Sequence, residues 1–234
     1  MKEQLKKLPS HIGFIIDGNG RWAKARLLPR SAGHKAGVDT LELIIQECFY
    51  TYNIPVVSIY AFSTENWNRP KKEVDYLCSL FENFTSEKFL KKFPNAKLNI
   101  MGDYSVFPQK LIDNVNNIIE KTKDNQSFTI NLGINYSGQD ELVKAVQDIV
   151  DEKENHITRE VIENHLYTKG QPKLDFVVRT SGEQRLSNFM LWQIAYSELY
   201  FTKTCWPAFK KKELRQALED YQNRDRRFGA IKEE

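Results

Sequence analysis

An apolar run at residues 12–16 stops abruptly at the carboxylate of Asp17 and a turn that contains Gly18 and Gly20. Because glycine has no Cβ, a ligand can approach the backbone closely there, and successive N–H groups in such a turn form an anion-binding concavity. Arg21 adds a guanidinium fork that matches phosphate. Asp17 would repel a diphosphate, unless a hard cation such as Mg²⁺ bridges the two. The turn therefore indicates a metal-bridged diphosphate, although an isolated turn of this type is more often an ordinary loop.

Two further cationic side chains follow the turn, Arg30 and His34, in a segment with Gly33 and Lys35. They open a long segment of helical spacing, so they would aim positive charge and N–H groups at the same anion. Beside an anion, His34 would favour its protonated form. Read singly, the two residues are a surface cation and a histidine at a helix start.

A second loop, residues 62–70, mixes hydroxyl, amide, guanidinium and aromatic groups. In a binding site, Ser63 and Asn66 would orient a reacting group while Trp67 screens it from water. The alternative is a helix entry capped by Asn68, with Trp67 as packing.

A third loop, residues 179–187, brings Arg179, Arg185 and Ser187 to one turn. Ser187 is predicted to be the N-cap of an apolar helix at residues 188–196, a role compatible with donation to a phosphate. The loop is therefore a second candidate anion site.

Two acidic residues accompany the third loop. Glu183 would hold an arginine in position. Glu198, just after the predicted helix, is either a second carboxylate near the metal or a solvated residue.

Runs rich in β-branched residues alternate with segments of helical spacing, which predicts an α/β fold. The predicted strands are residues 12–16, 56–61, 97–101, 128–134 and 174–178. The helical segments are marked by Leu41, Ile44, Ile45 and Cys48, by Val74, Leu77 and Phe81 after Pro70 as first helical residue, and by Leu142, Val146 and Ile149. Strands joined by such crossovers form a mainly parallel central sheet flanked by helices, and the three loops would meet at its carboxyl edge.

The composition places limits on the kind of protein. The 234 residues contain no linker or repeat, so we expect a single domain over 1–234. A net charge of +3 gives no reason to expect nucleic-acid binding. The basic runs Lys210–Lys212 and Arg224–Arg227 could bind nucleic acid, but such runs are more often solvated helix faces. The three scattered cysteines favour a reducing, cytoplasmic location. No run approaches the ~18 apolar residues of a membrane span.

The three loops in this order resemble the cis-prenyltransferase family, most closely the bacterial undecaprenyl diphosphate synthases (isoprenyl transferases). The matching segments are residues 11–23, 33–37, 60–70, 135–136 and 179–201 and the closing Arg227-Phe228-Gly229. The Asp-Asp-x-x-Asp element of the all-helical trans-prenyltransferases is missing. The resemblance implies a Mg²⁺-dependent enzyme that condenses isopentenyl diphosphate repeatedly onto farnesyl diphosphate, giving the polyprenyl diphosphate precursor of a cell-wall lipid carrier.

The resemblance also implies a role for each loop. Asp17 would engage Mg²⁺ and assist departure of the allylic diphosphate, and Glu198 would be the second metal-associated carboxylate. The allylic substrate would bind at Gly18, Asn19, Gly20, Arg21, Trp22, Arg30 and His34. Isopentenyl diphosphate would bind at Arg179, Arg185, Leu186 and Ser187. Between them would lie Ser63, Thr64, Glu65, Asn66, Trp67 and Arg69. Because a neutral amide is a poor base, we expect Asn66 to orient substrate while the departing diphosphate takes the proton.

A growing hydrocarbon chain needs an apolar tunnel, since each buried methylene contributes ~0.8 kcal/mol. Candidate lining residues are Leu77, Phe81, Ile100, Leu132 and Ile134, with the small Ala61 leaving passage; their alternative reading is ordinary core. Slow release of a long product, and a transient membrane-surface contact during release, would follow.

Three positions depart from the family pattern, namely Gln184 for a frequent histidine, Ala208 for an aspartate and Gln139 for an arginine. Gln184 removes an auxiliary metal ligand. The closing Arg227-Phe228-Gly229 implies a homodimer, because in this family it reaches a partner's site. Two alternatives stay open: a family member that makes shorter or longer products, and a non-catalytic subunit that stabilises a second prenyltransferase.

Overall fold

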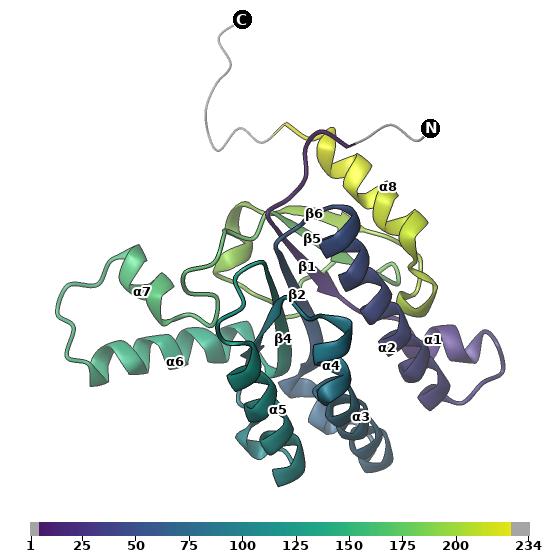
Figure 1. Cartoon of the computed structure of the whole chain (residues 1–234), viewed down its shortest axis with the longest axis horizontal. Coiled ribbons are helices and arrows are strands. Elements are labelled where there is room, and N and C mark those ends of the chain that lie inside the picture. The colour runs from purple at the N-terminus through teal and green to yellow at the C-terminus, as the bar shows by residue number, and fades with distance from the viewer. Residues whose placement is uncertain (1–4, 226–234) are drawn as a thin grey trace, which may run out of the picture.

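Six parallel strands form one sheet at the centre of the fold, with helices on either side of it (Figure 1). The computed structural model describes residues 5–225. In the order β3-β4-β2-β1-β5-β6, every neighbouring pair is parallel. The strands are β1 (His11–Ile15), β2 (Val56–Ser63), β3 (Ala96–Met101), β4 (Phe128–Tyr136), β5 (Phe176–Arg179) and β6 (Glu198–Phe201). The predicted α/β class, the parallel sheet and its first five strands are thus confirmed, whereas β6 was not predicted.

The crossovers are mostly helical. The helices are α1 (Asn19–Lys24), α2 (Arg30–Gln46), α3 (Lys71–Phe84), α4 (Glu87–Lys92), α5 (Gln109–Thr122), α6 (Gly138–Asp151), α7 (Arg159–His165) and α8 (Lys211–Gln222). Short 3₁₀ turns add η2 (Thr64–Asn68), η3 (Tyr104–Val106), η4 (Gln193–Tyr196) and η5 (Trp206–Ala208), and the π-helical turn η1 (Glu47–Thr51) extends α2. Pro70, predicted as a first helical residue, is the N-cap of α3, one position earlier.

The two faces of the sheet carry different cores. Ile12 and Phe14 of β1 point to one face, where they join a large apolar cluster with residues of α2, α3, α5 and α8, such as Ile44 and Leu214. Ile15, on the opposite face, belongs to a smaller cluster with Phe189 and neighbours from the segment between β5 and β6. The alternation follows from the two-residue period of a strand, with both faces covered.

A buried row of polar side chains crosses the second face. Asn131 Nδ2 donates to Ser58 Oγ (2.8 Å), and Asn99 Nδ2 donates to Asn131 Oδ1 (2.8 Å). His11 Nε2 lies 2.6 Å from Ser58 Oγ, and its Nδ1 lies 3.0 Å from the Pro172 carbonyl oxygen. A carbonyl only accepts, so Nδ1 carries the proton and neutral Nε2 accepts from the serine hydroxyl. Every member is therefore hydrogen-bonded despite its burial.

One element prediction was wrong, and one confirmed helix buries a different face from the one its pattern indicated. Residues 188–196 do not form a helix: Ser187, Asn188 and Met190 have φ of 49°, 64° and 45°, and only the turn η4 is helical. Because Asn188 and Met190 have positive φ, no right-handed helix begins after Ser187, and Ser187 is therefore not an N-cap. Helix α6 exists, but it buries Glu141, Ala145 and Ile149 and leaves Val146 exposed.

Candidate active site

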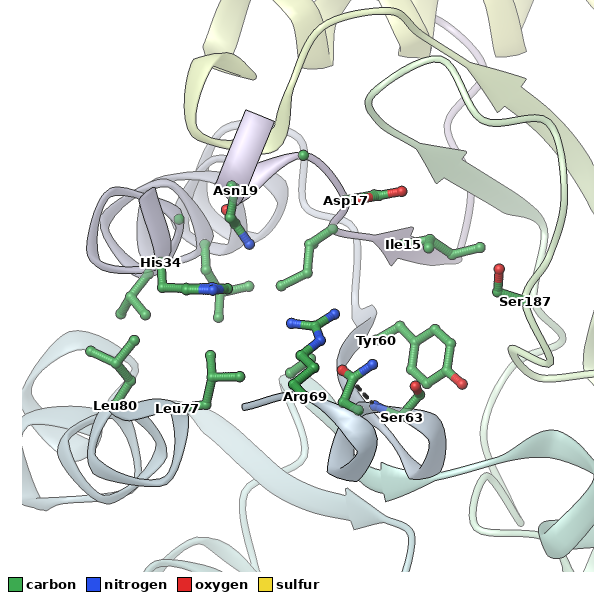
Figure 2. Close-up of a pocket in the computed structure, with 18 of the residues that line it drawn as sticks. Ile15, Asp17, Asn19, His34, Tyr60, Ser63, Arg69, Leu77, Leu80 and Ser187 are labelled. Atoms are coloured by element: carbon green, nitrogen blue, oxygen red, sulfur yellow. Dashed lines mark hydrogen bonds between the residues drawn. The ribbon is translucent and has the colours of Figure 1, made fainter. Parts of the chain in front are cut away.

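Asp17 lies just beyond the end of β1, beside β5, where the order of the strands reverses. Such a switch point is where parallel sheets bind ligands. The Asp17 carbonyl oxygen accepts hydrogen bonds from Thr180 Oγ1 (2.7 Å) and from Trp206 N (3.0 Å). Segments after β5 and β6 therefore fix the backbone, while the carboxylate lines a cavity (Figure 2).

Glycines allow the turn after Asp17 to pack closely. Gly18 has φ 101°, and a Cβ on it would lie 2.7 Å from Ser181 Oγ. A Cβ on Gly33 would lie 2.1 Å from the carbonyl oxygen of Asn19, and one on Gly37 would lie 2.4 Å from Asn19 Oδ1. The turn and α1 can lie against α2 only because these α2 positions have no side chain.

Two arginines share the Asp17 carboxylate. Oδ2 accepts from Arg21 Nη2 at 3.2 Å and from Arg179 Nη2 at 3.3 Å. Arg179 is only 4 % exposed and also donates to Ser187 Oγ (2.8 Å), yet its Nε is buried without a partner. Burial lowers the pKa of Arg179, and the negative charge of Asp17 opposes that shift. One carboxylate thus faces two guanidinium groups, an arrangement that a ligand anion would complete.

A second cluster of basic side chains surrounds Glu73 of α3. Its Oε1 accepts from Arg30 Nη2 (3.1 Å) and Arg69 Nη1 (3.2 Å), and it lies 3.2 Å from His34 Nε2. Three separate elements meet there, namely α2, the turn before α3, and α3 itself. Contrary to the protonation expected from sequence, burial lowers the pKa of His34, with the Glu73 carboxylate acting in the other direction.

The second loop forms the turn η2 through a reciprocal cap. Ser63 is its N-cap and accepts from the backbone N–H of Asn66, while Asn66 Oδ1 accepts from Ser63 N at 3.3 Å (Figure 2). The alternative, a helix entry capped by Asn68, is wrong, because Asn68 ends η2 and the N-cap of α3 is Pro70. The Trp67 indole donates to Asn135 Oδ1 (2.8 Å) and packs against Phe107. The amide oxygen of Asn66 is occupied, so its NH₂ group is the one available to a ligand.

One cavity of about 1170 Å³ joins these groups. Its polar end contains thirteen of the predicted site residues: Asp17, Gly18, Asn19, Gly20, Arg21, Arg30, His34, Ser63, Glu65, Asn66, Arg69, Arg179 and Ser187. Its apolar part lies between α2, α3 and the sheet and includes Val38, Leu41, Ala61, Leu77, Leu80, Phe81, Phe84 and Leu132. In Figure 2, Leu77 and Leu80 of α3 face His34 of α2 across the cavity. A charged head and an apolar tail would both fit.

Comparison with known proteins assigns the family. The family model described as "Putative undecaprenyl diphosphate synthase" matches residues 15–229. The chain belongs to this family. It is a cis-prenyltransferase, and curated relatives named isoprenyl transferase include those of Clostridium tetani and Streptococcus pyogenes serotype M1. They are 44 % and 46 % identical, over 97 % and 98 % of this chain and 91 % and 96 % of their own.

Solved structures of cis-prenyltransferases share the fold. Lavandulyl diphosphate synthase from Lavandula x intermedia, in complex with dimethylallyl diphosphate, has a TM-score of 0.90 at 32 % identity, covering 95 % of this chain and 99 % of that one. A probable undecaprenyl diphosphate synthase from Campylobacter jejuni has a TM-score of 0.79 at 32 % identity, covering 96 % and 100 %. The family resemblance seen in the sequence is confirmed.

The donor set of this cis-prenyltransferase suits a metal held jointly with a substrate. Within residues 5–225, no group of three or more His, Cys, Asp or Glu residues could hold a metal alone. Mg²⁺ usually binds one or two carboxylates plus substrate phosphates rather than an all-protein cage. Asp17, whose two side-chain hydrogen bonds both use Oδ2, fits such a shared site.

Six residues predicted at the site lie outside the cavity lining. Trp22 lies under the Arg26 guanidinium, Thr64 lines a second cavity, and exposed Arg185 pairs with Glu183, which also pairs with Arg21. The full set is Trp22, Thr64, Trp67, Arg185, Leu186 and Glu198. Ile100 and Ile134, predicted for the tunnel, pack in the core instead.

Glu198 begins β6, level with Phe176 at the amino end of β5, and pairs with Arg224 at 2.9 Å. Asp17 lies beyond the carboxyl end of β1, so one chain does not bring the two carboxylates together. The predicted motif Arg227-Phe228-Gly229 lies outside the described residues.

Sequence reasoning missed Glu73, Gln139 and Asn188 as residues at this site. Gln139 and Asn188 line the cavity, and Asn188 Oδ1 accepts from Gln139 N at 3.0 Å. Glu73 lies four residues after Arg69, a spacing typical of helical ion pairs, and this spacing in the sequence could have indicated it.

Proposed function

We propose that this cis-prenyltransferase extends farnesyl diphosphate by repeated condensation with isopentenyl diphosphate, in a Mg²⁺-dependent reaction. The product would be a long-chain polyprenyl diphosphate, undecaprenyl diphosphate, which serves as precursor of the cell-wall lipid carrier. The observation that carries this proposal is that one cavity has clustered cations at one end and an apolar lining at the other. A structural relative is described in complex with dimethylallyl diphosphate, which is also an allylic diphosphate.

In this proposal the two cationic groups hold the two diphosphates. Arg30, His34 and Arg69 would exchange Glu73 for the allylic diphosphate, which also meets the turn after Asp17. Arg179 and Ser187 would bind isopentenyl diphosphate, with exposed Arg185 swinging in from its pair with Glu183. Guanidinium groups suit this task because their forked donors match phosphate oxygens.

Condensation breaks the bond between C1 of the allylic substrate and its diphosphate, and C1 bonds to C4 of isopentenyl diphosphate. A proton then leaves C2 of the extended unit. Asp17 would hold the Mg²⁺, which when bound offsets the charge that develops on the departing diphosphate. Asn66, whose oxygen is engaged by Ser63 N, would donate through its NH₂ and orient the substrate, and the departing diphosphate would accept the proton.

We further propose that the enzyme works as a cytoplasmic homodimer. Val143, Val146 and Val150 of α6 are exposed, and contiguous exposed apolar side chains mark contact surfaces. Among residues 5–225, the structure has no helix that is long and apolar enough to cross a bilayer.

Chain elongation is the direct test. The purified protein is incubated with farnesyl diphosphate, labelled isopentenyl diphosphate and Mg²⁺, and the extracted products are sized by chromatography. A series ending at the undecaprenyl length, abolished by EDTA, is expected. A different end point would keep the chemistry and revise the product. No incorporation at any metal concentration would overturn the proposal and favour the non-catalytic subunit.

A further inference from the structure

The turn between α1 and α2, residues 25–29, presents two leucines to solvent. Leu27 is 97 % exposed and Leu28 is 44 % exposed, and no other large hydrophobic side chain within residues 5–225 is as exposed as Leu27. Leu27 also has φ 57°, a left-handed conformation that is uncommon for a residue with a branched side chain. A strained turn that displays an apolar side chain suggests a contact surface. We call residues 25–29 the Leu27–Leu28 turn.

Positive charge surrounds this turn. Residues 18–38 contain five Lys and Arg residues and no Asp or Glu. Arg21 and Arg30 pair with carboxylates from other segments. Lys24 and Arg26 have no carboxylate within ion-pair distance in the described part of the chain, and Arg26 lies 4.2 Å from the Trp22 ring centroid. An apolar tip with basic flanks complements an anionic lipid surface, because the leucines can enter the acyl boundary while the cations meet headgroup phosphates.

The Leu27–Leu28 turn also belongs to the mouth of the substrate cavity. Lys24, Leu27 and Leu28 line that cavity together with Asp17 and Arg30. If the proposed function holds, a growing polyprenyl chain must leave this cavity for a bilayer. If the mouth lay against lipid, the hydrocarbon would move from the cavity into the bilayer without being exposed to water. That exposure would cost ~0.8 kcal/mol per methylene.

We propose that the Leu27–Leu28 turn docks the enzyme on an anionic lipid bilayer. Leu27 and Leu28 insert at the boundary between headgroups and acyl chains, and Lys24 and Arg26 bind headgroup phosphates. The role of docking in product release rests on the proposed function, but the binding to lipid itself requires no substrate.

The test is flotation of the full-length protein with vesicles of pure phosphatidylcholine and with vesicles that contain one-third phosphatidylglycerol. We expect binding to the anionic vesicles that weakens as salt rises. Leu27→Ser/Leu28→Ser should lower the partition coefficient at least about tenfold, from the lost apolar insertion. Lys24→Gln/Arg26→Gln should lower it by roughly fivefold per charge. Ile157→Ser removes another exposed apolar side chain (54 % exposed), between α6 and α7 and on the side of the fold away from α1 (Figure 1), and should change nothing.

Several results would overturn the docking surface: no vesicle binding by the wild type, undiminished binding by Leu27→Ser/Leu28→Ser, or an equal loss with Ile157→Ser. Sedimentation velocity without lipid, on the same variants, asks whether the turn instead joins two copies of the chain. If the leucine variant changed its oligomeric state, the turn would be a contact with a second copy of the chain and not with lipid. Elongation of farnesyl diphosphate is measured separately, so a protein that elongates without binding vesicles contradicts this inference alone. Binding without elongation would contradict only the proposed function.

Discussion

At the scale of single residues, Asp17 is held in the cavity by contacts of both its side chain and its backbone. Its carboxylate balances Arg21 and Arg179, and its carbonyl oxygen ties together the segments after β5 and β6. We expect Asp17→Ala to reduce kcat by on the order of a hundredfold or more, because a group that stabilises the departing diphosphate acts mainly in the transition state. Steady-state elongation kinetics with Mg²⁺ measure this, with circular dichroism confirming the fold. Near-wild-type turnover would exclude Asp17 from the mechanism.

Glu73 is expected to position three cations rather than react. In Glu73→Ala, Arg30, His34 and Arg69 would lose their shared acceptor and repel one another, so the KM for farnesyl diphosphate should rise roughly tenfold. The KM for isopentenyl diphosphate should change little, and Glu73→Gln, which keeps an acceptor oxygen, should recover part of the loss. Glu82→Ala is the control, since Glu82 lies on the same helix but pairs with Lys110. Equal increases in both KM values would contradict a local role.

The types of the site residues were readable from sequence, but their conformations were not. Asp17 follows β1 and Arg179 is the last residue of β5. Because the carboxyl ends of parallel strands meet at one edge, their proximity follows from the fold class. The chemistry of Ser187 suits an N-cap, yet the positive φ of Asn188 and Met190 prevents a helix from following it. That conformation depends on tertiary hydrogen bonds: Asn188 Nδ2 donates to Ser137 Oγ (2.7 Å), and Gly138 N donates to the Asn188 carbonyl oxygen (2.7 Å).

At the scale of elements, strand prediction from the sequence succeeded where both faces of the strand are buried. The apolar runs in β1 and β2 are nearly continuous because each strand has apolar neighbours on both sides, whereas β4 also contains Thr129, Asn131 and Asn135. β6 is an edge strand of four half-buried residues, and it has no such run. Periodicity also failed on α6, where buried Glu141 accepts from Tyr167 N and Tyr136 Oη and so takes a core position. A hydrogen-bonded buried carboxylate leaves no trace in an apolar pattern.

The packing of α1 on α2 depends on Gly33. A Cβ at this position would lie 2.1 Å from the Asn19 carbonyl oxygen and 3.1 Å from Ala23 Cβ. We expect Gly33→Ala to displace α1 and the turn after Asp17, lowering kcat/KM for farnesyl diphosphate by at least about tenfold and lowering Tm. Lys35→Ala, an exposed change on α2, serves as control. If Gly33→Ala behaved like Lys35→Ala, the close approach of the two helices would be irrelevant to the site.

At the scale of the whole molecule, His11 should couple stability to pH. Burial lowers its pKa from 6.5 to about 4, so the unfolded chain binds a proton in that window while the folded chain does not. The free energy of unfolding should therefore fall by about 3 kcal/mol as pH drops from 6.5 to 4. Protonated Nε2 would also leave the Ser58 hydroxyl without its acceptor.

Urea titrations at several pH values, on the wild type and on His11→Gln, measure this coupling. The variant should be less stable at neutral pH but should lose less stability on acidification. His34, whose pKa burial also lowers, contributes in the same direction, so part of the slope should persist. An unchanged slope in His11→Gln would assign the acid sensitivity to other groups.

The assembly of the molecule is expected to depend on the outer face of α6. Val143, Val146 and Val150 are 69 %, 56 % and 62 % exposed and, at spacings of three and four residues, they form one stripe along the helix. Because a charge in an apolar contact would have to be desolvated, Val146→Glu should weaken the proposed homodimer by at least roughly tenfold in Kd. Sedimentation equilibrium over a range of protein concentrations measures this, with Ile157→Glu as an exposed control off the stripe. A dimer unaffected by Val146→Glu would place the contact on another face, and a wild type that stays monomeric would mean that each chain must complete its site alone.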